Sequence, residues 1–72
     1  MPFEIFDQVL YMQIRVANLY RQAHQVTIDD FLKLDRETDL LQFVAVAYEE
    51  FHHTGDPGIL EEVDDYVAKA LS

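Results

Sequence analysis

Residues 39–53 read DLLQFVAVAYEEFHH, and this stretch decides the fold class. Its central run FVAVA would suit a buried strand, because a short apolar run fits a strand and a buried helix equally well. Across all fifteen residues, however, the apolar positions recur at helical spacing. They share one helix face: Leu40, Phe43, Val44, Ala47, Tyr48 and Phe51. We therefore predict a single helix over 39–53.

Three further stretches show helical periodicity, and together the four predict an all-α fold. In 3–24 the apolar residues are spaced alternately four and three apart, and a second apolar row widens their face. Thr27 is placed to cap the stretch 28–34, and Pro57 suits the first position of 57–71. We expect residues 1–72 to form one compact domain. Its four helices are predicted at 3–24, 28–34, 39–53 and 57–71.

Turn residues set the expected boundaries between these helices. The polar stretch 35–39 is expected to interrupt the helical structure, with Asp35 or Thr38 capping the helix that follows. Gly55 is expected to end the third helix in the left-handed conformation, which costs glycine little. Asp56 is then expected to cap the fourth helix.

The chain is short for a protein that holds its own core. A domain of this size buries only about 60% of the surface that its unfolded form exposes. It has no cysteine, so no disulfide supports the core, yet 50% of its residues are apolar, too many for a disordered acidic segment. Because the apolar sector of helix 3–24 is unusually wide, we expect that helix to mediate homodimerisation.

Acidic residues are concentrated in the second half of the chain. Residues 1–36 hold five acidic and four basic side chains, whereas 37–72 hold nine acidic side chains and one basic one, Lys69, for a total net charge of −9. Such a surface attracts a basic partner and repels polyanions. We expect a basic protein partner to bind the outer faces of the last two helices. The expected contact residues are Glu49, Glu50, Glu61, Glu62 and Asp65.

The predicted helices between 28 and 53 have the outline of a helix-turn-helix motif. A recognition helix needs side chains such as Arg, Lys, Asn or Gln at base edges, with basic groups on the phosphates. Here its outer face offers Asp39, Glu49 and Glu50, and no Lys or Arg occurs between Glu37 and Lys69. We therefore expect no binding to nucleic acid.

Two overlapping Glu-x-x-His spacings occur at 49–53, pairing Glu49 with His52 and Glu50 with His53. On a helix each pair lies on one side, as in half of a carboxylate-bridged di-metal site. The other helices offer no inward-facing carboxylates to complete such a site, and a His near a helix C-terminus is also explained by the helix dipole. We favour a structural role and expect no metal or cofactor. The alternative is a metal-binding protein built around His52 and His53.

Motifs for catalysis or membrane insertion are not evident in the sequence. There is no cysteine nucleophile, and the only glycines, Gly55 and Gly58, form no phosphate-binding loop. No apolar run approaches the roughly 18 residues of a membrane span, and the N-terminus lacks the basic and apolar regions of a signal peptide. We expect a non-catalytic, cytoplasmic protein.

Three polar side chains near the apolar faces of the last two helices need partners. Asp64 borders the apolar face of 57–71, and we expect an arginine or a backbone N–H to hold it. Tyr48 and Tyr66 have hydroxyls that need partners when buried. We expect a Tyr–His or Tyr–Asp hydrogen bond to join the two helices.

The pattern LxxVxxxYExFHHTG at 41–55, followed by VDDYV at 63–67, resembles a family of short bacterial proteins of unknown function. In that family a helix ends in Tyr, an acid, a hydrophobe, His, Thr and Gly, and an Asp-containing helix follows. The resemblance covers about residues 26–67, and this chain departs from it in having His52 and His53 in tandem. Some members are encoded beside ADP-ribosyltransferase-like, toxin-type proteins. The resemblance therefore implies an accessory or antitoxin-like role, with no catalytic residues to carry over.

Overall fold

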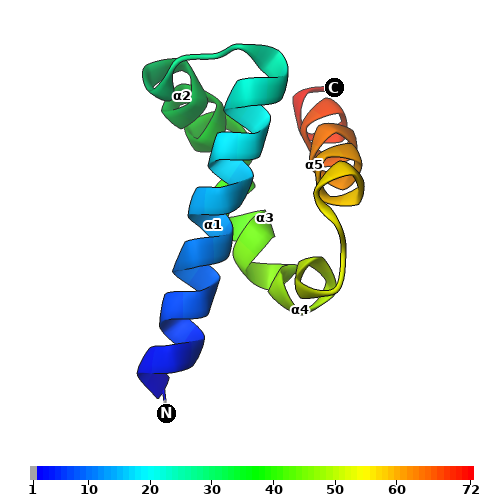
Figure 1. The fold of residues 1–72 in the computed structure, drawn as a ribbon. Helices are drawn as coiled ribbons and strands as arrows, with labels where there is room; N and C mark the ends of the chain where they lie inside the picture. The colour runs from blue at the N-terminus through cyan, green and yellow to red at the C-terminus, as the bar shows by residue number, and fades with distance from the viewer. Residues whose placement is uncertain (1) are drawn as a thin grey trace.

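The computed structural model describes the backbone of residues 2–72 and the side chains from Asp7 onward. This part of the chain contains five helices and no strand, which confirms the all-α prediction. The helices are α1 (Pro2–His24), α2 (Ile28–Thr38), α3 (Leu40–Val46), α4 (Tyr48–His52) and α5 (Asp56–Leu71). Figure 1 shows α1 as the longest helix, with the other helices gathered beside it. The count is five where four were predicted, because the predicted helix 39–53 is divided.

The core is built from one face of each helix. On α1 the buried residues Met12, Val16 and Tyr20 follow one another at intervals of four, which places them along one side of the helix. Ile59, Val63 and Val67 do the same on α5. The remaining buried apolar side chains are Phe31, Leu40, Val44 and Phe51. The face predicted for 39–53 therefore packs into the core, through Leu40, Val44 and Phe51.

Helix α2 is longer than predicted, which corrects the expected range 28–34. Its start agrees with the prediction, because the Thr27 hydroxyl accepts a hydrogen bond from the N–H of Asp30 at 3.1 Å. The helix then continues through the polar stretch to Thr38, a buried residue whose hydroxyl donates to the Leu34 carbonyl at 2.8 Å. Arginine and glutamate, which precede Thr38, are good helix formers, so the polar character of the stretch does not end the helix.

A single residue, Asp39, links α2 to α3. It adopts the left-handed conformation (φ 55°, ψ 39°), and its N–H donates to the Asp35 carbonyl at 2.7 Å. The Asp35 carboxylate accepts the N–H of Leu41 at 2.8 Å, near the start of α3. Of the two predicted caps, Asp35 therefore serves α3, whereas the Thr38 hydroxyl bonds back into its own helix.

The predicted helix 39–53 bends at Ala47. There the backbone lies near φ −89°, ψ 10°, outside the helical region. Hydrogen bonds still continue through this point, since the N–H of Ala47 donates to the Phe43 carbonyl at 2.9 Å and the N–H of Phe51 donates to the Ala47 carbonyl at 2.9 Å. The apolar period is therefore preserved across α3 and α4 while the helix axis changes.

The link between α4 and α5 corrects two expectations. Gly55 is extended (φ −71°, ψ 163°) and stands as the residue before α5, so it is not left-handed. The left-handed residues among those described are Gln25 and Asp39. Asp56 is the first residue of α5 and forms an ion pair with Arg15 of α1, so it does not cap its own helix. Pro57 was predicted at the first position of this helix and is its second residue, because α5 begins one residue earlier, at Asp56.

None of the described helices combines the length and the apolar character that crossing a membrane requires.

Candidate acidic binding site

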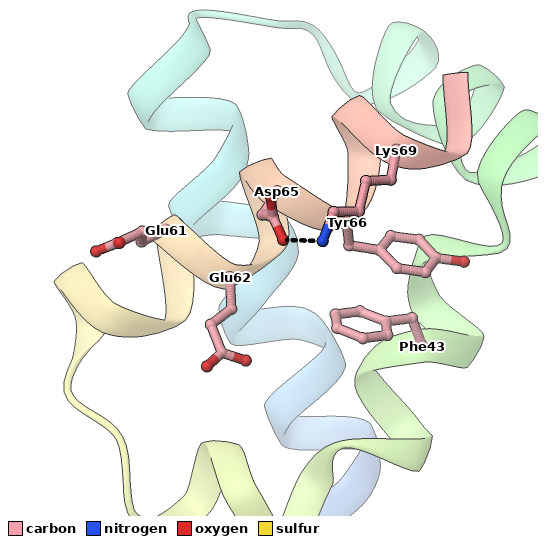
Figure 2. A pocket seen from close by; sticks show the side chains of 6 residues that line it. All are labelled: Phe43, Glu61, Glu62, Asp65, Tyr66 and Lys69. Carbon is pink, nitrogen blue, oxygen red and sulfur yellow. Dashed lines mark ion pairs between the residues drawn. The ribbon is translucent and has the colours of Figure 1, made fainter. Parts of the chain in front are cut away.

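The outer face of α5 meets α3 along an open cleft of about 530 Å³. The cleft is lined by Phe43 of α3 and by five residues of α5: Glu61, Glu62, Asp65, Tyr66 and Lys69. Figure 2 shows the Glu61 side chain pointing away from the Phe43 and Tyr66 rings, with Asp65 turned toward Lys69. We call this feature the acidic cleft. It contains three of the five residues predicted to contact a partner.

The aromatic wall of the acidic cleft is held by contacts on both sides. The rings of Phe43 and Tyr66 stack with their centroids 4.0 Å apart and their planes 12° apart. Phe43 also meets the buried Phe51 edge to face at 5.8 Å. The Tyr66 hydroxyl donates to the backbone carbonyl of Thr38, at the end of α2. The wall is therefore fixed between the core and a helix terminus.

The tyrosine hydroxyls do not make the hydrogen bonds predicted for them. Tyr66 bonds to a backbone carbonyl, because the last carbonyls of a helix have no partner within that helix. Tyr48 donates to the side-chain oxygen of Gln8 on α1 at 2.7 Å. Neither hydroxyl joins the last two helices through a His or an Asp, and the two tyrosines instead tie them to α2 and α1.

The carboxylates of the acidic cleft differ in how far they are neutralised. The Lys69 ammonium lies 3.0 Å from the Asp65 carboxylate, and both side chains are exposed. Such surface pairs contribute about 0–1 kcal/mol, so Asp65 is only weakly held. Glu61 and Glu62 are exposed and take no part in the ion pairs found among the described side chains. The cleft therefore retains a net negative charge.

The other two predicted contact residues, Glu49 and Glu50, do not line the acidic cleft. They are exposed on α4 and are not among the six residues that line it. Conversely, sequence reasoning missed Phe43 and Tyr66 as site residues, since both were assigned to inner apolar faces. Their partial burial shows that each ring serves the core and the cleft together. The position of an aromatic residue at the edge of an apolar helix face was the sequence signal that could have identified Phe43 and Tyr66 as site residues.

Asp64 is held by a partner that the sequence did not suggest. The Nε2 atom of His24, at the end of α1, lies 2.7 Å from the Asp64 carboxylate. The imidazole in turn lies against the Tyr20 ring, with centroids 4.3 Å apart. Burial, and then the negative charge of Asp64, raise the pKa of Tyr20 above its ordinary value of about 10. These three side chains connect α1 to α5.

The raised pKa of Tyr20 predicts a loss of stability in alkaline solution. Because the pKa of Tyr20 is higher in the folded protein than in the unfolded chain, protonated Tyr20 favours the folded state. This contribution to stability is complete at a pH below the pKa of the unfolded chain. It is lost as the pH rises through the pKa of the folded protein. We expect the free energy of unfolding to fall above about pH 10, and to fall less in Tyr20→Phe. Urea unfolding at pH 8 to 11 measures both, and equal alkaline losses in the two proteins would contradict the prediction.

The tandem histidines, His52 and His53, do not belong to a group of metal-ligating side chains among the described residues. His52 and His53 are exposed, and the His52 ring stacks on Tyr48 with centroids 5.5 Å apart. Helix α4 ends at His52, so the Glu50 and His53 pair is not contained within one helix. Among the described side chains, no group of three or more His, Asp or Glu residues is arranged to hold a metal ion. The arrangement gives the metal alternative no support.

Comparisons of the chain with protein-family models, curated proteins and solved structures gave no match.

Proposed function

We propose that the protein is a non-catalytic interaction module whose acidic cleft binds a basic protein partner. The observation that carries this proposal is the grouping of Glu61, Glu62 and Asp65 along one cleft, where Lys69 is the only basic side chain. The negative charge is thus concentrated on a rigid helix and beside an apolar wall. This is a shaped site, in contrast to a diffuse acidic surface.

The chemistry of the acidic cleft suits an arginine or lysine side chain of the partner. Carboxylates accept charge-assisted hydrogen bonds from a guanidinium or ammonium group, and these bonds are about twice as strong as neutral ones. The long apolar stem of such a side chain can lie against Phe43 and Tyr66 while its charged end reaches the carboxylates. The cleft volume of about 530 Å³ leaves room for one such side chain.

Within this proposal the protein acts in the bacterial cytoplasm as an accessory or antitoxin-like component. Support comes from the resemblance of about residues 26–67 to short bacterial proteins, some of which are encoded beside toxin-type proteins. A toxin-type partner would present the basic surface that the acidic cleft receives. We propose that the module is a homodimer joined through α1.

The test measures binding of a fluorescent arginine-rich peptide by stopped-flow anisotropy. We expect the association rate to fall steeply with salt, since electrostatic attraction mainly accelerates encounter. Glu61→Gln, Glu62→Gln and Asp65→Asn together should weaken binding about tenfold, a loss of about 1.4 kcal/mol.

The matched control makes the same change in charge elsewhere on the surface. Asp29→Asn, Asp30→Asn and Glu37→Gln remove three exposed charges from α2. This variant should weaken binding only about twofold, through the change in overall charge. Equal losses in the two triple variants, or an association rate independent of salt, would contradict a specific role for the acidic cleft.

A further inference from the structure

The fold leaves a strip of aliphatic side chains uncovered across α1 and α2. Leu10 and Ile14 on α1 are 46% and 54% exposed, and Ile28 and Leu32 on α2 are 47% and 45% exposed. Between them lies a groove of about 160 Å³. Its lining is completed by Gln13, Ala17, Phe31 and Leu41. We call this surface the α1–α2 groove.

Helix geometry explains why this surface is exposed. Leu10 and Ile14 are four residues apart, as are Ile28 and Leu32, so each pair forms a short row along its helix. On α1 this row lies about 160° around the helix from the buried row that contains Met12 and Val16, because the two rows are offset by two residues. The apolar sector of α1 is thus wider than the rest of the chain covers. A contiguous aliphatic surface of this kind marks an interaction site more often than scattered exposed residues do.

Charge favours a second copy of the chain as the occupant of the groove. The whole molecule carries a net charge of −9, which makes two copies repel each other over most of their surfaces. The α1–α2 groove lies in the half of the chain with nearly balanced charge, and α2 itself bears both Asp29 and Asp30 and the basic Lys33 and Arg36. A basic partner would be attracted instead to the acidic half.

The dimensions of this face suit a dimer. A stable interface buries about 800 Å² on each partner, and the chain exposes 5119 Å² in total. At about 1.5 Å per residue, the 23-residue α1 is about 35 Å long and the 11-residue α2 about 16 Å, so a face that spans both helices has the dimensions such an interface needs. A twofold interface also requires that projections and hollows occur on the same surface. Here the exposed rows project and the groove between them provides the hollow.

We infer that two copies of this chain associate about a twofold axis, each placing its exposed aliphatic rows against the α1–α2 groove of the other. This inference rests on the dimer of the proposed function and locates its interface. In the dimer the leucine and isoleucine side chains leave water. The acidic cleft takes no part in the contact.

Analytical ultracentrifugation over a range of protein concentrations tests the inference. We expect the native chain to dimerise and Leu32→Glu to raise the dissociation constant at least about 100-fold, because the change places a charge in an apolar interface. The matched control, Val46→Glu, alters a side chain that is 76% exposed and lies outside the groove. It should dimerise within about threefold of the native chain.

The possible outcomes distinguish the α1–α2 interface from the two earlier proposals, the homodimer and peptide binding to the acidic cleft. A chain that stays monomeric at every concentration would overturn both the dimer and its interface, while peptide binding to the acidic cleft is measured independently. A dimer that persists in Leu32→Glu would overturn the α1–α2 groove alone.

Labelling of single cysteines covers the case in which Leu32→Glu does not fold. The chain has no cysteine of its own, so Leu32→Cys and Val46→Cys each introduce one reactive thiol. We expect maleimide to label residue 32 more slowly at concentrations that favour the dimer, and residue 46 equally fast at all concentrations. Unprotected labelling of residue 32 would count against the inference.

Discussion

Phe51→Ala is expected to remove about 3–5 kcal/mol from the free energy of unfolding, the usual cost of truncating a buried phenylalanine. Phe51 is fully buried in α4 and contacts the Phe43 ring edge to face. A domain of 72 residues holds about 4–11 kcal/mol in total. The variant should therefore lose a large part of its stability, and urea unfolding followed by circular dichroism measures the loss.

The control for this prediction is Val46→Ala. Val46 lies on the adjoining helix α3 and is 76% exposed, so its truncation leaves no cavity. We expect a change within about 0.5 kcal/mol, as for most surface substitutions. If the two variants lost similar amounts of unfolding free energy, the burial of Phe51 in the core would be contradicted. The Phe51 variant should also loosen the aromatic wall of the acidic cleft, because Phe43 rests on Phe51.

Asp39→Val is expected to destabilise the protein by about 2 kcal/mol, because a β-branched residue is poorly tolerated at positive φ. Asp39 has φ 55° and is the only residue between α2 and α3. Its side chain makes no capping hydrogen bond, so the substitution acts through the backbone conformation. The substitution therefore changes the single-residue link that sets the relative orientation of α2 and α3.

Asp39→Gly provides the comparison for Asp39→Val. Glycine adopts the left-handed conformation without steric cost, and its extra freedom in the unfolded state costs at most about 1 kcal/mol. Urea unfolding should rank the glycine variant clearly above the valine variant. If the two were equally stable, the left-handed turn at Asp39 would not control the stability of this link.

Helical periodicity was sufficient to predict the all-α class and which side chains share a helix face. Residues Ile59, Val63 and Val67 illustrate why, since spacing along one helix fixes which side chains share a face. The same pattern could not locate the bend at Ala47, where hydrogen bonding and apolar period both continue. Nor could it show that Asp39, and not Gly55, takes a left-handed conformation, because several polar residues could have served that turn.

The candidate site was predicted only in part, for a related reason. Glu61, Glu62 and Asp65 share a helix, so their common exposure follows from spacing alone. The contact between Phe43 and Tyr66 depends on how α3 packs against α5, and no local pattern contains that information. The same holds for His24 and Asp64, which are 40 residues apart in the chain.

Helix α3 has a consequence for how many partners an assembly could hold. It supplies Leu41 to the α1–α2 groove and Phe43 to the acidic cleft, and these residues are about 200° apart around the helix. Occupation of one surface therefore leaves the other accessible. A dimer joined at the groove would be bivalent, and a partner with two basic segments would bind its second segment at a raised effective concentration. Such avidity would raise the overall affinity for the partner even if each acidic cleft binds one segment only weakly.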